Sequence, residues 1–216
     1  MTHTMTETIT WGPKALPVPY AAAWTGESTR VAVALAVRPG GNGLGYRDEV
    51  PGDRDRHGVL WTRMDAEPGA GRPDFRALHP ARQRRTMLER LCQVCGGPAD
   101  RTSRGWLFLV QRAEVADFGD VEGLLSTKPP VCRPCAALAV RHCPHLTDPL
   151  LIRSRKPRTW GVFGGFFTPD PDSDGIVPHP EDHHLPYGHP DARWFLAAQL
   201  VIELTRCTVE KEERRE

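Results

Sequence analysis

The sequence predicts an α+β fold that is rich in loops, consists mostly of antiparallel β-sheet with a few helices, and is organised around a four-cysteine module. Three observations support this fold class. Four cysteines form two closely spaced pairs in the middle of the chain. A content of 21 Pro and 20 Gly in 216 residues leaves room for few long elements. The apolar runs are short, which is typical of strands and short helices.

The first cysteine pair is Cys92 and Cys95, and the second is Cys132 and Cys135, with a spacer of 36 residues at positions 96 to 131. In each pair the i, i+3 spacing lets one tight turn direct two sulfurs at the same point. Four thiolates suit a tetrahedral zinc ion. Two disulfides or four free thiols are alternatives, but nothing in the sequence indicates the oxidising compartment that disulfides need. We therefore expect these cysteines to bind one structural Zn²⁺.

The residues around the two pairs predict a treble-clef or zinc-ribbon-like module. Gly96 and Gly97 follow the first pair, where glycine permits a turn with positive φ. Residues 106–110 predict a strand inside the spacer. The second pair leads into a helix-forming stretch, so Cys135 is expected in the first helical turn, where the helix dipole favours a thiolate. Four cysteines satisfy one zinc ion, so we expect no metal role for three candidate ligands after this helix: His142, Cys143 and His145.

The rest of the chain divides into a region before this module and a region after it. Residues 1–78 are expected to form an N-terminal extended and β region. Strands at 31–37 and 58–64 would pair antiparallel across a charged, glycine-rich loop. Residues 79–148 form the four-cysteine module, which begins with a basic helix at 80–91.

Residues 149–216 are expected to form one compact unit with the zinc module. A β-hairpin would have arms at 150–153 and 159–167, followed by an acidic, histidine-containing loop. A C-terminal helix would run from Pro190 to Arg206 and dock an apolar stripe on the core. The stripe comprises Trp194, Ala197, Ala198, Val201, Leu204 and Thr205.

The expected hairpin turn holds the densest basic cluster in the chain, and a cluster of this kind can contact a phosphate or an acidic partner. A solvated turn is the alternative. The net charge of +1 gives no global field that would draw the protein to nucleic acid or membranes, so such a contact needs a local patch. The candidate partner-binding residues are Arg153, Arg155, Lys156 and Arg158.

Residues 170–181 match the calcium-loop pattern D-x-D-x-D-G-x5-E, from Asp170 to Glu181. Pro178 and Pro180 obstruct the helix that normally follows such a loop. Asp, Pro, Ser and Gly are also ordinary loop residues. We therefore expect this loop to be free of calcium.

Asp182, His183 and His184 come directly after that loop, with His179 and His189 nearby. An Asp-His-His cluster can hold a catalytic metal. The cluster resembles the Asp-His-x-x-Pro element of HNH endonucleases, which implies an HNH-like metal-dependent nuclease as one alternative. In that family the element lies between the two knuckles, whereas here it follows both. A polar surface loop is therefore the preferred interpretation.

Two segments resemble a known group of proteins. Residues 91–96 and 129–136, together with 143–146, resemble actinobacterial and actinophage zinc proteins that have four cysteine ligands and are of largely unassigned function. A weaker resemblance is to the recombination directionality factors of phage large serine integrases, small accessory proteins that bind the integrase and switch its synapsis preference. These segments cover about a quarter of the chain. The resemblance implies a protein partner, a site-specific recombinase bound to DNA.

The four-cysteine set leaves no open position on the zinc for chemistry. We therefore expect a non-enzymatic, zinc-stabilised accessory or regulatory protein that acts by protein–protein contact on a DNA-acting complex. Direct nucleic-acid binding through the basic helix and the hairpin turn is a second alternative. The polar N-terminus and the lack of an apolar run of about 18 residues predict a cytoplasmic protein without membrane contact.

Overall fold

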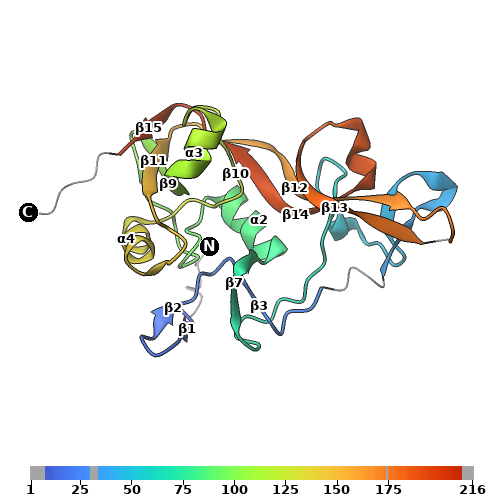
Figure 1. The fold of residues 1–216 in the computed structure, drawn as a ribbon, viewed down its shortest axis with the longest axis horizontal. Coiled ribbons are helices and arrows are strands. Elements are labelled where there is room, and N and C mark those ends of the chain that lie inside the picture. Colours follow the sequence, from blue (N-terminus) through green and yellow to red (C-terminus); the bar gives the residue numbers. More distant parts are fainter. Residues whose placement is uncertain (1–7, 30–33, 174, 211–216) are drawn as a thin grey trace, which may run out of the picture. The chain divides into compact units, whose positions relative to one another are not determined.

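The computed structural model describes residues 8–29, 34–173 and 175–210. Within these ranges the protein is a mixed α+β structure, mostly sheet, which confirms the predicted fold class at this level (Figure 1). No helix in the described part of the chain is long and apolar enough to cross a membrane. The helices there are α2 (Pro80–Glu89), α3 (Arg112–Phe118) and α4 (Arg133–His142).

The chain folds into two compact units, and each unit combines stretches that are not consecutive in sequence. Each unit contains residues from all three of the segments expected from the sequence, 1–78, 79–148 and 149–216. Two of the four places where the chain passes between the units lie inside β12 (Arg158–Pro169) and β14 (Phe195–Glu203). The first unit comprises Met1–Ala22, Arg82–Thr159 and Ile202–Glu216, and the second comprises Ala23–Ala81 and Trp160–Val201.

The first unit contains a four-stranded antiparallel sheet in the order β15-β11-β9-β8. Figure 1 labels the first three of these strands. Strand β9 contains the predicted strand at 106–110, which is confirmed. A two-stranded sheet of β1 (Thr10–Trp11) and β2 (Leu16–Pro17) belongs to the same unit. The four strands are β8 (Arg101–Thr102), β9 (Gly105–Gln111), β11 (Pro149–Ser154) and β15 (Cys207–Val209).

The core of the first unit lies against the cysteine module. One face of β9, helix α4 and the first cysteine pair share one buried cluster. Helix α2 confirms the predicted basic helix, although it is more deeply packed than a solvated face: Met87 is fully buried, and buried Arg82 donates to the Ala22 carbonyl at 2.6 Å. The buried members of the cluster are Cys92, Leu107, Leu109, Val131 and Ala136.

The second unit is built from short strand pairs and most of a five-stranded sheet. That sheet has the order β10-β14-β12-β13, and β6 pairs with β14. A buried cluster of Leu35, Leu44, Tyr46, Leu60 and Leu196 forms a core in this unit. The strands not yet given are β3 (Ala22–Trp24), β4 (Leu35–Val37), β5 (Leu44–Tyr46), β6 (Leu60–Trp61), β7 (Pro73–Leu78), β10 (Leu125–Ser126) and β13 (Ile176–Pro186).

The predicted pairing of 31–37 with 58–64 is wrong. Residues 30–33 lie outside the described ranges, and β4 pairs antiparallel with β5 instead. Strand β6 pairs parallel with β14. Gly40 and Gly43 adopt positive φ just after β4, so the chain turns back at once. Closing this short loop costs less entropy than closing the long loop that the predicted pair would need.

The predicted hairpin at 150–167 is also wrong, although both of its strands exist. Strand β11 belongs to the four-stranded sheet, whereas β12 pairs with β13. The backbone between the two strands makes its hydrogen bonds with another part of the chain: Arg155 N donates to the Arg206 carbonyl, and Lys156 N donates to the Thr205 carbonyl. Pro157 has no N–H to continue a ladder. The link between β11 and β12 therefore leads from one sheet into another and does not close a hairpin.

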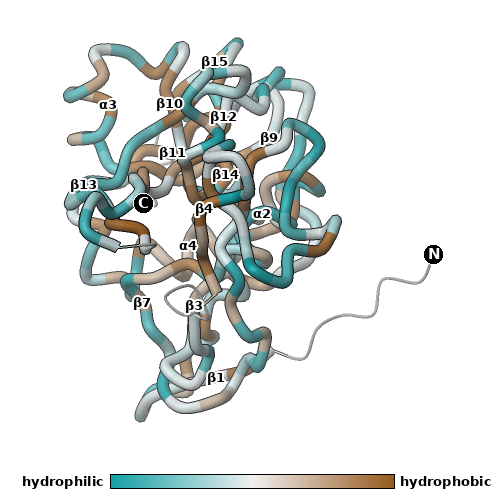
Figure 2. The backbone as a smooth tube through the Cα atoms, turned by 90° about the vertical axis from the view of Figure 1, so that its right-hand side faces the viewer, coloured by the Kyte–Doolittle hydropathy of each residue, from teal (hydrophilic) through white to brown (hydrophobic). Residues whose placement is uncertain are grey.

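The predicted C-terminal helix is wrong as well. A 3-10 helix η3 (Pro190–Trp194) leads into β14, which lies between β12 and β10. Both faces of the strand are covered, as in a central strand: completely buried Ala197 and Val201 lie on one face and completely buried Ile202 on the other. The Ala and Leu content favours a helix, but pairing on both edges decides the outcome. The expected acidic, histidine-containing loop is largely strand β13, which Figure 2 colours as hydrophilic, in contrast to hydrophobic β14.

Candidate metal centre

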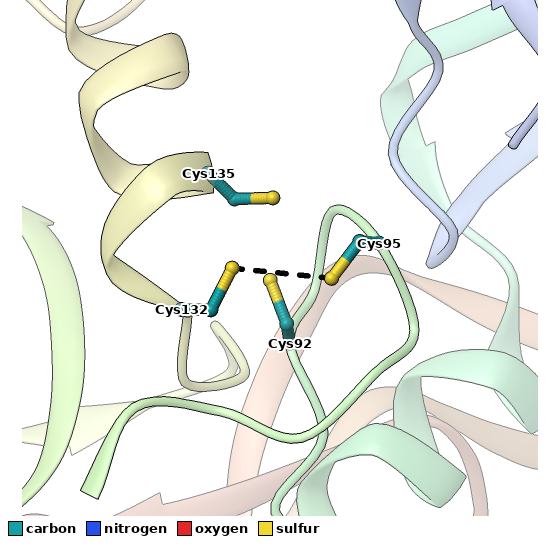
Figure 3. A group of neighbouring side chains, drawn as sticks. All are labelled: Cys92, Cys95, Cys132 and Cys135. Carbon is teal, nitrogen blue, oxygen red and sulfur yellow. Dashed lines mark hydrogen bonds between the residues drawn. The ribbon is translucent and has the colours of Figure 1, made fainter. Parts of the chain in front are cut away.

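The two cysteine pairs meet at one point (Figure 3). The Sγ atoms of Cys92, Cys95, Cys132 and Cys135 all lie within 4.8 Å of one another. Cys95 Sγ and Cys132 Sγ are 3.9 Å apart. Sulfurs at the corners of a tetrahedron around zinc, each about 2.3 Å from the ion, are separated by about 3.8 Å. The cluster therefore has the size of a metal site with four thiolate ligands.

The first pair is held by a tight turn. Gly96 N donates to the Cys92 carbonyl at 2.9 Å, and Cys92 N donates to the Gly97 carbonyl at 2.6 Å. Gly96 has φ +68°, and a Cβ atom there would meet the ring of Tyr20 at 3.0 Å. Glycine is required at this position because of both the backbone conformation and the close approach of the ring. The sequence predicts a tight turn at this cysteine pair, and the structure confirms it.

The N-terminal segment fixes the knuckle from outside. Tyr20 N donates to the Val94 carbonyl at 2.9 Å, and Ala21 N donates to the Gln93 carbonyl at 3.1 Å. Gln93 N in turn donates to the Pro130 carbonyl at 2.9 Å, which links the knuckle to the approach of the second pair. The two ligand pairs are thus positioned by backbone hydrogen bonds as well as by the metal they can hold.

The second pair lies at the start of α4. Cys132 is the N-cap residue, and Ala136 N donates to the Cys132 carbonyl at 2.9 Å. Cys135 is in the first helical turn, as predicted. The positive end of the helix dipole favours a thiolate there.

Four sulfurs this close repel one another once they are ionised. Burial raises the pKa of the Cys135 thiol, and the neighbouring cysteines raise it further. Four thiolates can therefore coexist only around a cation, and a divalent ion compensates part of their charge. The residues present fit a four-thiolate metal site, in which the protein supplies every ligand.

The extra candidate ligands do not join this site. Within the described residues, the four cysteines are the only group of three or more candidate ligands close enough to share an ion. Cys143 is the C-cap residue of α4, with its N–H bonded to Ala139. His142 and His145 lie beside it in sequence.

The histidine cluster lies on one extended strand. In the register of β13, His183 is opposite Gly164 and His184 is opposite Phe163. The His184 ring packs against Phe163, and the His183 ring packs against Phe166. Consecutive side chains of a strand point to opposite faces, so His183 and His184 do not converge with Asp182 on one point. His179 also packs on Phe166, and the His189 side chain caps η3.

The calcium-like stretch is divided between two elements. Asp170 begins the turn between β12 and β13, where its carboxylate accepts from Asp172 N at 3.0 Å and from Ser173 Oγ at 2.7 Å. Glu181 lies on β13. Asp174 falls outside the described residues. Freedom from calcium remains a prediction.

The basic cluster separates into buried and exposed members. Arg155 and Lys156 are exposed on the link between β11 and β12, and Arg158 is exposed at the start of β12. Arg153 is fully buried, so it is not available as a contact residue and is removed from the candidate set. It lies on β11, where alternate side chains face the interior, rather than on a turn.

Arg153 instead belongs to an ionic cluster that the sequence did not reveal. Its Nε donates to Glu210 Oε1 at 2.7 Å, and its Nη1 pairs with Asp100. Arg133 and Arg104 bond the same Glu210 carboxylate. Burial raises the pKa of the Glu210 carboxyl, but the hydrogen bonds from Arg153 and Arg133 outweigh it and hold the pKa below its ordinary value. Because Arg133 lies between the ligands Cys132 and Cys135, this cluster ties the metal-binding helix to the sheet.

Comparison with known proteins gives no family for this chain. No protein-family model, no curated protein and no solved structure matches it.

Proposed function

We propose that this chain is a non-enzymatic, zinc-stabilised accessory protein that acts by contact with a protein partner in a complex that works on DNA. The observation that carries the proposal is the closed set of four thiolates. Zinc held by four cysteines has no open position for a water or substrate, so its role is to hold the fold together.

The metal module is best described as a treble clef. The order of elements supports this assignment: a knuckle at 92–97, the β8–β9 hairpin, and helix α4 with the second ligand pair in its first turn. Helix α3 and β10 are inserted between the hairpin and α4. The soft donor set favours zinc over oxygen-preferring metals.

The partner follows from the resemblance to directionality factors, which makes a large serine integrase the first protein to test. The zinc-loaded chain is mixed with purified integrase and DNA carrying the hybrid attachment sites. The expected results are a stable complex and recombination between those sites only when the chain is present. No complex and no change in recombination would remove the integrase as partner.

The nuclease alternative is tested in parallel. Supercoiled plasmid is incubated with the chain and Mg²⁺ or Mn²⁺. The proposal expects intact plasmid. Cleavage that disappears in a His183→Ala, His184→Ala double variant would overturn the non-enzymatic assignment.

A further inference from the structure

One end of the four-stranded sheet carries cations contributed by three separate parts of the chain. In the sheet register Arg101 is opposite Trp106, Trp106 is opposite Ser154, and Ser154 is opposite Cys207. This row crosses all four strands, a distance of about 15 Å at the usual strand spacing. The turns that follow the row hold the remaining cations. We call this set the cationic strip: Arg101, Arg104, Arg155, Lys156, Arg158 and Arg206.

Backbone contacts fix these turns against one another. Arg155 N donates to the Arg206 carbonyl at 3.3 Å. Gly105 is closely packed, since a Cβ atom there would lie 2.0 Å from the Ser154 carbonyl oxygen and 2.5 Å from Arg155 N. Arg90 Nη2 donates to the Pro157 carbonyl at 3.0 Å. The backbone that carries the strip is therefore held in place by these contacts.

The strip keeps an excess of positive charge after its ion pairs are counted. All six side chains are exposed. Arg158 pairs with Glu203, and Arg104 shares Glu210 with Arg133 and Arg153. In the described part of the chain, no carboxylate pairs with the other four cations of the strip. Arg101 stacks on the Trp106 ring at 4.3 Å, which keeps its charge available.

The surface between the turns is hollowed. A depression of about 330 Å³ is lined by Lys156, Arg158 and Arg206 together with Glu122 and Glu203. The Glu122 carboxylate accepts from Arg206 N and Cys207 N, both at 2.8 Å, and Glu203 bonds Arg158. Both acids of the depression are therefore engaged in holding the turns, and the cations face the solvent.

The composition of the strip fits a phosphate backbone better than a protein surface. Protein interfaces are anchored by buried aromatic and aliphatic residues. None of the large exposed hydrophobic residues of the described chain belongs to 101–106, 154–158 or 204–207. Nucleic-acid backbones are bound mainly by charge, with Arg and Lys contacting successive phosphates. Duplex DNA carries about one negative charge per 1.7 Å of helix axis, so a strip of about 15 Å faces several phosphates at once.

We propose that the cationic strip binds the phosphate backbone of duplex DNA without reading its sequence. This deepens the proposed function and rests on it for the presence of DNA in the complex. The strip then holds the accessory protein against the DNA on which its partner acts.

The test uses the full, zinc-loaded chain and a fluorescein-labelled random-sequence DNA duplex. Fluorescence anisotropy is measured over a series of KCl concentrations. We expect a Kd of about 1–100 μM at physiological salt and tighter binding at lower salt. The four cations without a carboxylate partner correspond to a slope of log K against log[KCl] of about −3 to −4.

Two variants with the same change of net charge locate the binding surface. Arg155→Gln with Lys156→Gln removes two members of the strip and should flatten the slope by about 2. Arg112→Gln with Arg141→Gln is the control. Arg112 is the first residue of α3 and follows Gln111, which pairs with Pro149 at the opposite end of the ladder from Ser154. Arg141 lies in the last turn of α4. Zinc content and melting temperature should stay near wild type in both variants.

Three results would overturn the inference. The first is no salt-sensitive DNA binding by the wild type. The second is an equal loss of slope in the control variant, which would indicate a diffuse charge effect. The third is binding to poly-glutamate but not to DNA, which would assign the strip to an acidic protein. Failure of the integrase assay with the strip result intact would instead remove the protein partner and leave a DNA-binding protein.

Discussion

Polar groups that could bind a metal or an ion are arranged in two ways in this molecule. In the first unit they converge: the four thiols come from a knuckle and a helix, and Glu210 is reached by arginines from a strand, a helix and a turn. On β13, in the second unit, the acids and histidines follow one another along a single strand and alternate between its faces. Side chains converge on one point here because the fold brings together elements that are distant in sequence. A single stretch that is rich in acids and histidines does not bring its side chains together in this way. We therefore expect large effects from changes in the convergent groups and small ones on β13.

The largest effect is expected at the metal site. Cys132→Ser should abolish zinc retention and destabilise the fold by about 5 kcal/mol, because structural metal binding is coupled to folding. This corresponds to a decrease in melting temperature of more than about 10 °C for a chain of this size. Metal analysis and calorimetry measure both quantities. Cys143→Ser is the matched control and should retain zinc. Full zinc content and unchanged melting in Cys132→Ser would contradict the site.

The ionic cluster should come next. Arg153→Met keeps the volume but leaves Glu210 and Asp100 without their shared buried partner, which should cost about 3–5 kcal/mol. Chemical denaturation measures the loss. The matched control is exposed Arg155→Met, which should change stability by less than about 0.5 kcal/mol. Equal stability of the two variants would show that Arg153 is not a structural residue.

Stability measured over a series of pH values distinguishes the contribution of the Glu210 charge from that of its packing. Its folded pKa lies below the ordinary value of 4.5, so its ion pairs contribute fully above that pH and are lost as the pH falls through the folded pKa. Glu210→Gln should therefore be less stable than wild type by about 2 kcal/mol at pH 7. The two proteins should approach each other in stability as the pH falls through the folded pKa of Glu210. A difference that does not change with pH would assign the effect to packing alone.

The smallest effect is expected on β13. His183→Ala with His184→Ala removes two ring contacts with phenylalanines and should cost less than about 2 kcal/mol. Zinc content should be unchanged. Thermal unfolding and metal analysis of the double variant provide the measurement. A loss of zinc from this variant would contradict the distinction between the converging thiols and the alternating side chains of β13.

The same distinction explains how far the sequence could be interpreted. The metal site could be predicted because each ligand pair is local: Cys-x-x-Cys followed by glycines marks a turn, and the helix formers after Cys135 mark α4. Strand β9 could be predicted from its short apolar run. The burial of Arg153 could not be predicted from the sequence, because its partner Glu210 is 57 positions away and their pairing depends on the order of strands in the sheet. The stretch of β14 predicts a helix because its apolar residues fit helical spacing, but an apolar run that is buried on both faces fits helical spacing as well as a central strand.

The interleaving of the two units determines how the chain can be divided. Neither unit is one continuous stretch, so no single cut separates one unit from the other. All four thiols have been synthesised once residue 135 is made, whereas Glu210 follows β15 near the far end of the chain. On the ribosome the metal module can close before Arg153 has met its carboxylate partner. A truncation that removes residues 207–210 leaves the cysteine motif complete, but it exposes the edge of β11 and leaves the buried charge of Arg153 without Glu210. A loss of function in such a deletion variant would therefore reflect misfolding and would not locate a functional site.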